Sequence, residues 1–256
     1  MSADLDLAVA VAHEAGAGLR DAFGRLGDLA ISAKSTPTDL VSEADVTTER
    51  LIRERLEAAR PDDAIMGEEG DDRPGTSGLR WVVDPLDGTV NFLFGIPQWC
   101  VSIACEDAGG VRAGVVYDAL REETWAAVRD GAATLDGVPF RAPQRGGLGT
   151  ALVATGFGYD AAVRESQARV VARMLPHVRD VRRLGAAALD LAWAAAGRFD
   201  AYFERGVKHW DVAAGALICA RAGLAVHQLP PAPPAEQGLL VAAPGIADEL
   251  LALVSD

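Results

Sequence analysis

The sequence predicts an α/β protein in which helices cover sheets, arranged as two packed subdomains. Half of the 256 residues are hydrophobic and 24% are charged, which is typical of a globular chain with a sizeable core. Helix-like and strand-like hydrophobic patterns alternate along the chain. A Gly-, Pro- and Gln-rich segment at 141–149 is the best candidate for the boundary between the two subdomains. We therefore expect an α+β subdomain over residues 1–145 and an α/β subdomain over residues 146–256.

The first subdomain opens with two predicted helices. Residues 4–24 carry apolar side chains at helical spacing, and a short strand is expected at 29–33. The second helix is expected at about 42–59. Ser42 is its predicted N-cap, and the acidic Asp45 falls in its first turn, where its charge complements the helix dipole.

A polar loop at 70–79 precedes a series of strands separated by Gly, Asp and Pro, a pattern that predicts an antiparallel meander. The first strand begins at Arg80, and the others are expected at 100–106, 111–117, 123–128 and 133–140.

The second subdomain alternates strands with helices. Strands are expected at 151–155, 180–184, 201–204, 224–227 and 239–242. Helices are expected at 161–175, 185–196 and 211–221 and at the end of the chain, and the prolines between 230 and 234 mark a loop.

Composition also limits the partners and the compartment. The net charge of −13 disfavours a nucleic-acid partner, because such binding depends on clustered Lys and Arg. No run of about 18 uncharged apolar residues predicts a membrane span, and the first residues lack the pattern of a signal peptide. Cys100, Cys105 and Cys219 are odd in number and have no Cys-x-x-Cys spacing, which excludes a disulfide framework. We expect a cytoplasmic protein.

Acidic residues recur in four stretches next to predicted strand ends or helix starts. These are Asp39 and Asp45 in DLVSEAD, Glu68 and Glu69 in MGEEG, Asp84 and Asp87 in DPLDGT, and Asp211 in HWDVAAG. Carboxylates that gather closely raise each other's pKa and destabilise the fold unless a cation lies among them. Oxygen ligands without cysteine or paired histidine favour Mg²⁺, Mn²⁺ or Ca²⁺ over zinc.

The DPLDGT stretch combines features of a metal site and a phosphate site. Pro85 fixes the backbone, so that the Leu86 carbonyl and both aspartates can point at one spot. If Gly88 and Thr89 open a short helix, their N–H groups face an anion. Each acidic stretch alone has a simpler interpretation as a turn, a cap or a solvated pair. Their joint occurrence along one chain favours a single site.

The motifs GEE (67–69), DPLDGTVNF (84–92) and WDVAAG (210–215), preceded by VSEAD (41–45), strongly resemble the inositol monophosphatase family. The resemblance covers nearly the whole chain. It implies an alternating α-β-α-β-α sandwich of the type shared with fructose-1,6-bisphosphatase, and a homodimer. It also implies Mg²⁺-dependent, lithium-sensitive hydrolysis of a small phosphate monoester with two or three ions.

The resemblance also implies roles for individual residues. Metal ligands would be Glu68, Asp84, the Leu86 carbonyl, Asp87 and Asp211. Catalytic residues would be Asp45, Glu68, Glu69 and Thr89, with Asp45 and Thr89 polarising the nucleophilic water. Substrate contacts would be Leu86, Asp87, Gly88, Thr89, Ala187, Glu204 and Asp211. Lys34 falls where the family often has a lysine.

The expected reaction is the hydrolysis of inositol 1-phosphate by a metal-activated water. Glu204 can accept hydrogen bonds from a polyol or hold the ammonium of histidinol, so histidinol phosphate is the main alternative substrate. Fructose 1,6-bisphosphate and nucleotide phosphates stay open as well, because arginines and Lys208 are available for a second phosphate. A metal-binding regulatory partner without enzymatic activity is the alternative from another class.

Overall fold

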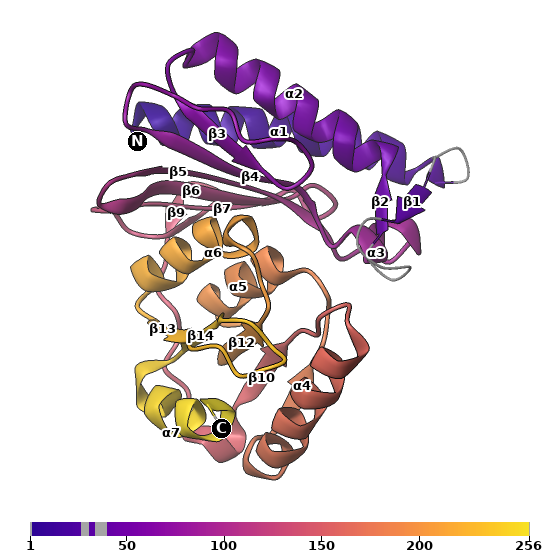
Figure 1. Cartoon of the computed structure of the whole chain (residues 1–256). Helices are drawn as coiled ribbons and strands as arrows, with labels where there is room; N and C mark the ends of the chain where they lie inside the picture. The colour runs from indigo at the N-terminus through magenta and orange to yellow at the C-terminus, as the bar shows by residue number, and fades with distance from the viewer. Residues whose placement is uncertain (1, 27–30, 34–39, 256) are drawn as a thin grey trace.

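Five layers, alternating between helices and sheets, make up the molecule (Figure 1). The computed structural model describes residues 2–26, 31–33 and 40–255. Within these residues the helices are α1 (Ala3–Phe23), α2 (Glu43–Ala59), α3 (Thr89–Leu93), α4 (Ala161–Met174), α5 (Ala187–Ala195), α6 (His209–Ala222) and α7 (Pro244–Ser255). Helices α1 and α2 cover one sheet, α5 and α6 lie between the two sheets, and α4 and α7 cover the far side of the second. The predicted sandwich is confirmed.

The first sheet is the predicted meander with one parallel strand added at its edge. Its strands are β3 (Ala64–Gly67), β4 (Arg80–Asp87), β5 (Cys100–Asp107), β6 (Gly110–Asp118), β7 (Glu123–Val128), β8 (Thr134–Leu135) and β9 (Val138–Pro139), in that order. Strand β3 runs parallel to β4, and every later pair is antiparallel.

The second sheet has the order β11-β10-β12-β14-β13. Its strands are β10 (Leu152–Thr155), β11 (Asp180–Arg182), β12 (Ala201–Arg205), β13 (Ala225–Leu229) and β14 (Gly238–Ala242). Strand β10 is parallel to both β11 and β12, whereas β14 is antiparallel to both of its neighbours. A separate antiparallel pair consists of β1 (Ile31–Ala33) and β2 (Leu40–Ser42). The division of the chain near residue 145 stays a prediction.

Helix α2 begins where the sequence predicts. The Ser42 hydroxyl accepts hydrogen bonds from the N–H groups of Ala44 and Asp45, at 3.2 and 3.4 Å, and the Asp45 carboxylate accepts from the Ser42 N–H at 2.9 Å. This reciprocal arrangement is a capping box, which satisfies donors that a helix start leaves without partners. It also fixes the Asp45 carboxylate beside the end of β4, because Thr89 donates to it.

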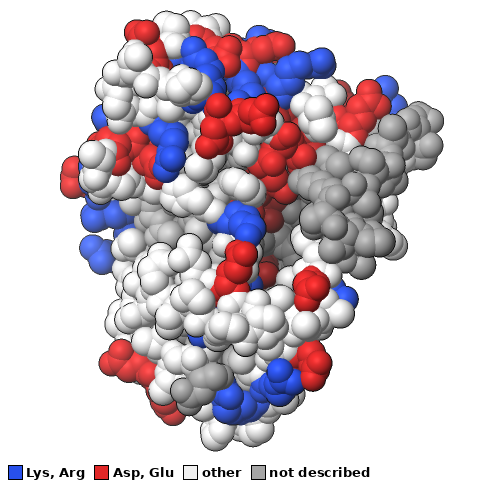
Figure 2. Space-filling view, viewed as in Figure 1, with Lys and Arg blue, Asp and Glu red and all other residues white. Residues whose placement is uncertain are grey.

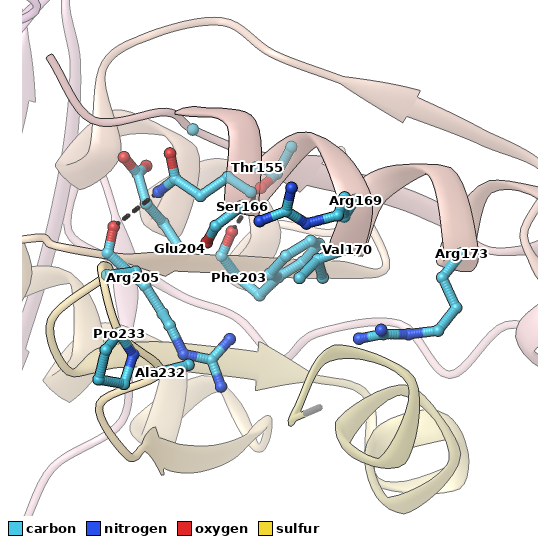
Figure 3. Close-up of a pocket in the computed structure, with 13 residues that line it drawn as sticks. Thr155, Ser166, Arg169, Val170, Arg173, Phe203, Glu204, Arg205, Ala232 and Pro233 are labelled. Atoms are coloured by element: carbon cyan, nitrogen blue, oxygen red, sulfur yellow. Dashed lines mark hydrogen bonds between the residues drawn. The ribbon is translucent and has the colours of Figure 1, made fainter. Parts of the chain in front are cut away.

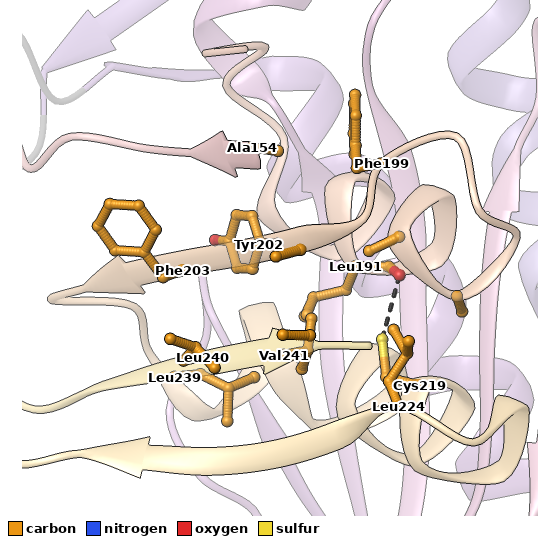
Figure 4. Close-up of a cluster of buried hydrophobic side chains, with 14 of the residues drawn as sticks. Ala154, Leu191, Phe199, Tyr202, Phe203, Cys219, Leu224, Leu239, Leu240 and Val241 are labelled. Atoms are coloured by element: carbon orange, nitrogen blue, oxygen red, sulfur yellow. Dashed lines mark hydrogen bonds between the residues drawn. The ribbon is translucent and has the colours of Figure 1, made fainter. Parts of the chain in front are cut away.

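A hydrophobic core joins α5 and α6 to the second sheet (Figure 4). Tyr202 of β12, Val241 of β14, Leu191 of α5 and Cys219 of α6 all belong to this core, and the Cys219 thiol donates to the Leu191 carbonyl at 3.2 Å. All three cysteines are free and buried, in agreement with the expectation that they form no disulfide framework. The buried side chains fix the backbone at the end of β12, from which the Glu204 side chain extends.

One expectation about strands was wrong, and one strand was missed. Residues 133–140 form two short strands, because Asp136 and Gly137 have positive φ angles of 52° and 77° and turn the chain back on itself. Strand β3 was not expected, since its four residues are too few to show a clear period. Part of the strand expected at 29–33, together with Lys34 and Asp39, lies outside the described residues.

Candidate functional site

A cavity of about 500 Å³ lies between the end of β4 and the carboxyl ends of β10 and β12. It is lined by Glu68, Asp84, Leu86, Asp87, Gly88, Thr89, Phe157, Gly158, Tyr159, Asp160, Val163, Arg183, Gly185, Ala187, Glu204, Gly206, Val207, Lys208, Trp210, Asp211, Pro234 and Glu236. Nine of the predicted site residues are among them. On the face in Figure 2, acidic side chains (red) lie in the middle of the molecule, between its upper and lower parts.

The end of β4 bends so that two aspartates face the same cavity. Asp84 pairs with Ser102 of β5 and Asp87 with Cys100, so three steps along β4 match two along β5. This extra residue is a β-bulge. Residues three apart in a regular strand point to opposite faces, whereas the bulge brings Asp84 and Asp87 to one side. The Leu86 N–H donates to Asp84 Oδ1 at 3.1 Å and stabilises the bend.

Strand β3 places Glu68 beside Asp84. In the parallel pair, Gly67 lies opposite Val83, and the next residues of the two chains are Glu68 and Asp84. Gly67 leaves room for the Glu49 side chain, because a Cβ at Gly67 would lie 2.5 Å from Glu49 Oε1.

Helix α6 brings Asp211 to the same cavity. The Ser102 hydroxyl donates to the Trp210 carbonyl at 3.4 Å, and Ser102 is the strand partner of Asp84. The helix begins at His209, two residues before the predicted start. Asp211 accepts a hydrogen bond of 2.6 Å from the Lys208 N–H, which directs its carboxylate to the N-terminal end of the helix.

Crowding of these carboxylates is visible in their pKa values. Burial, followed by the negative charges of Glu68, Asp87 and Asp211, raises the pKa of Asp84 well above its usual value. Burial and the charge of Asp87 likewise raise the pKa of Asp211. The four groups therefore interact electrostatically in the lining of one cavity.

Asp87 is held by the start of α5. Its carboxylate accepts hydrogen bonds from the N–H groups of Ala187, Ala188 and Leu189 at 3.0, 2.8 and 3.3 Å, and from the Cys100 thiol at 3.5 Å. Burial raises the pKa of Asp87 to about 6, although these hydrogen bonds oppose the shift. The predicted contact residue Ala187 therefore lies beside Asp87 in the cavity wall.

Gly88 and Thr89 form the predicted turn into a short helix. Gly88 has a φ of 93°, and a Cβ at this position would lie 2.8 Å from the Gln98 carbonyl oxygen. The Thr89 hydroxyl lies 2.8 Å from Asp45 Oδ1 and 3.0 Å from the Leu86 carbonyl oxygen. Asp45 is fully buried behind Thr89, and burial raises its pKa.

Glu69 stands apart from the residues that the resemblance grouped with it. It lines a different hollow, beside Glu49 and Arg53 of α2, and its N–H donates to Glu49 Oε2 at 2.7 Å. Its supporting role in catalysis stays a prediction.

The sequence reasoning missed the wall that faces the carboxylates. Phe157 and Tyr159 follow β10, and Asp160 caps α4 by accepting from the N–H groups of Ala162 and Val163 at 2.8 and 3.1 Å. The Arg183 guanidinium lies over the Phe157 ring, 5.9 Å from its centre. Two aromatic residues that alternate with glycines, in GFGY, were the one available signal.

The donor chemistry of the cavity fits a hard divalent cation. Four carboxyls and the Leu86 carbonyl line one wall, and each pair of carboxylates repels unless positive charge lies between them. As they stand in the described part of the chain, no three His, Cys, Asp or Glu side chains form a group that could hold an ion. The side chains would therefore have to close around the cation.

Comparisons with known proteins show to which family this chain is similar. A family model described as "Inositol monophosphatase family" matches residues 1–256. The protein named Inositol-1-monophosphatase SuhB from Mycobacterium tuberculosis is 50% identical over 236 residues, which are 88% of this chain and 81% of that protein. A protein named Nus factor SuhB from Pasteurella multocida is 39% identical, over 87% of this chain and 84% of its own length.

Solved structures show the same architecture. The extragenic suppressor protein suhB from Bartonella henselae superposes with a TM-score of 0.93 at 33% identity, covering all of this chain and 99% of that one. Among the described residues, no helix is long and apolar enough to cross a membrane.

Proposed function

The chain belongs to the inositol monophosphatase family, and we propose that it hydrolyses inositol 1-phosphate to inositol and phosphate with Mg²⁺ as its cofactor. The observation that carries this proposal is the meeting of the carboxyls of Glu68, Asp84, Asp87 and Asp211 at one cavity. The start of α3 and the Glu204 carboxylate line the same cavity. The groups that would hold the cations and those that would contact the phosphate and the ring therefore line one cavity.

The ions would be held by Glu68, Asp84, the Leu86 carbonyl, Asp87 and Asp211. When bound, Mg²⁺ stabilises negative charge on the phosphoryl oxygens and lowers the pKa of a coordinated water. The charges of Glu68, Asp87 and Asp211 all act on Asp84, in agreement with its place among the residues that would hold the ions.

Thr89 and Asp45 would orient the attacking water. Because the Thr89 hydroxyl donates its proton to Asp45 Oδ1, its oxygen keeps lone pairs that can accept a hydrogen bond from water. The buried Asp45 carboxylate fixes the direction of this hydrogen bond, and the capping box fixes the position of Asp45. The N–H groups of Gly88 and Thr89 would bind the phosphate, while Ala187 and Glu204 would contact the ring.

A substrate panel tests the assignment. Phosphate release should depend on Mg²⁺, stop in EDTA, and show a higher kcat/KM for inositol 1-phosphate than for histidinol phosphate, fructose 1,6-bisphosphate or a nucleotide phosphate. A far higher kcat/KM for histidinol phosphate would show that the substrate is wrong while the phosphatase chemistry is right.

The non-enzymatic alternative has its own support, since two relatives that are 39% and 41% identical to this chain bear the name Nus factor SuhB. Absence of Mg²⁺-dependent phosphate release from every substrate in the panel would favour that role.

The proposal also includes a homodimer, a cytoplasmic location and the absence of a nucleic-acid partner. Light scattering after gel filtration tests the first, and a gel-shift assay with RNA tests the last.

A further inference from the structure

The Glu204 carboxylate lies between two cavities. It lines the large cavity and also a smaller one of about 230 Å³ that is bounded by α4 and the proline-rich loop. Figure 3 shows Glu204 at the edge of this smaller cavity, beside the end of β12. Close packing fixes most buried side chains, but it cannot fix one that has space on two sides. Another interaction must hold Glu204 in place.

Tyr202 supplies that interaction. Tyr202 and Glu204 are two residues apart on β12 and therefore lie on the same face of the strand. The Tyr202 ring is fully buried, and its hydroxyl donates to Glu204 Oε2 at 2.8 Å. No other residue in the described part of the chain makes a hydrogen bond to this carboxylate. Oε1 is left to accept a hydrogen bond from a ligand.

Gly156 provides the room for this arrangement. It follows β10, the neighbour of β12 in the sheet. A Cβ at Gly156 would lie 1.8 Å from Glu204 Oε2 and 2.5 Å from Oε1, so any other residue would displace the carboxylate.

Tyr202 opposes the effect of burial on the Glu204 carboxyl. Burial raises the pKa of Glu204 to about 7, whereas the Tyr202 hydrogen bond and the Arg183 charge lower it and the Asp87 charge raises it. Asp190 and Asp211 also interact electrostatically with Glu204. Tyr202 therefore favours the ionised form, which accepts hydrogen bonds from hydroxyl groups.

We propose that Tyr202 and Gly156 are positioning residues that hold the Glu204 carboxylate toward the large cavity, and that they thereby set the preference for hydroxyl-bearing phosphate monoesters. The proposal rests on the proposed function. Tyr202 acts through Glu204 and touches no substrate. Its effect should therefore appear with a polyol phosphate and be absent with a phosphate ester that has no hydroxyl near Glu204.

The test compares Tyr202→Phe, Gly156→Ala and Glu204→Gln with inositol 1-phosphate and 4-nitrophenyl phosphate as substrates. Loss of one hydrogen bond to a charged group should lower kcat/KM for inositol 1-phosphate about tenfold or more in Tyr202→Phe, mainly through KM. For 4-nitrophenyl phosphate, kcat/KM should stay within about twofold, since that ester makes no hydrogen bond to Glu204. Tyr117→Phe, a buried tyrosine of β6 packed against α1, is the matched control and should change neither.

A double-mutant cycle shows whether Tyr202 acts through Glu204. Adding Tyr202→Phe to Glu204→Gln should change kcat/KM for inositol 1-phosphate by less than about twofold. The proposal is overturned if Tyr202→Phe impairs both substrates equally, or if its effect persists in full in the Glu204→Gln background.

The four proteins of the cycle are the parent, Tyr202→Phe, Glu204→Gln and the double variant. Their unfolding in urea, measured in EDTA, separates this inference from the proposed function. Tyr202→Phe should lower the unfolding midpoint of the parent protein and have a smaller effect in Glu204→Gln. If the parent hydrolyses 4-nitrophenyl phosphate but not inositol 1-phosphate, the proposed substrate is wrong, and the preference inferred for Tyr202 falls with it. Coupling in the unfolding cycle would still support the positioning contact, and absence of coupling would refute it.

Discussion

Replacing Asp87 with Asn removes one negative charge from the cavity and preserves the size of the side chain. The carboxylate now accepts three N–H groups at the start of α5. An amide has one acceptor oxygen, so its NH₂ group would face at least one of these donors. The substitution therefore loses hydrogen bonds and relieves electrostatic repulsion at the same time.

The two effects on stability are of similar size. Raising the pKa of Asp87 from 3.8 to about 6, chiefly by burial, corresponds to roughly 3 kcal/mol against the charged form. That shift already includes the hydrogen bonds, and the buried N–H left facing the amide NH₂ opposes this gain by about 1 to 3 kcal/mol. We expect the free energy of unfolding of Asp87→Asn in EDTA to lie within about 2 kcal/mol of the parent value.

Activity should respond far more than stability. A neutral amide is a weaker ligand for Mg²⁺, so kcat for inositol 1-phosphate should fall by about 100-fold or more and the Mg²⁺ requirement should rise. Phosphate release during a Mg²⁺ titration measures both. Asp190→Asn is the matched control, because Asp190 is a buried carboxyl of α5 outside the cavity lining. A parent-like kcat and an unchanged Mg²⁺ dependence in Asp87→Asn would refute the assignment.

Three further outcomes are expected. Mg²⁺ at about 100 times its Kd should stabilise EDTA-treated protein by about 2.7 kcal/mol and raise Tm by roughly 5 to 10 °C, and an unchanged Tm in differential scanning calorimetry would contradict the metal site. Folding raises the pKa of Glu204 from 4.5 to about 7, so its contribution to stability is present in full below pH 4.5 and is lost as pH rises through 7. Glu204→Gln should flatten that part of the pH dependence of urea unfolding in EDTA, and an identical dependence would count against the raised pKa. Gly88→Ala places a Cβ at a positive φ, 2.8 Å from the Gln98 carbonyl, and should lower the free energy of unfolding by about 1 to 3 kcal/mol in urea titrations, more than Gly78→Ala, where a Cβ meets no atom.

Local sequence was sufficient where backbone chemistry acts over a few residues. The cap at Ser42, the turn at Gly88 and the bend after Asp84 each depend on side chains within four positions. The hairpin at 134–139 also depends on local sequence, because Asp136–Gly137 is a typical turn pair. It was missed because the surrounding residues were interpreted as one apolar strand.

The far wall of the cavity could not be predicted in the same way. Phe157 and Tyr159 belong to a loop whose position depends on β10 lying beside β12, a pairing between residues almost 50 positions apart. Hydrophobic periods along one segment carry no information about which strand becomes its neighbour. Motif resemblance supplied Glu204 and Ala187, but it supplied no aromatic residue.

The meeting of Glu68 with Asp84 shows how the two kinds of information combine. The GEE and DPLDGT motifs identified both carboxyls as candidates, but neither motif by itself predicts that the two side chains are adjacent. Their adjacency follows from the parallel register of β3 with β4, in which Gly67 lies opposite Val83. A one-residue slip of this pair would move Glu68 away from Asp84 and turn β3 over, burying the wrong side chains. The buried Ile65 and the space that Gly67 leaves for Glu49 therefore select the register, and packing on α2 thereby determines the geometry of the metal ligands.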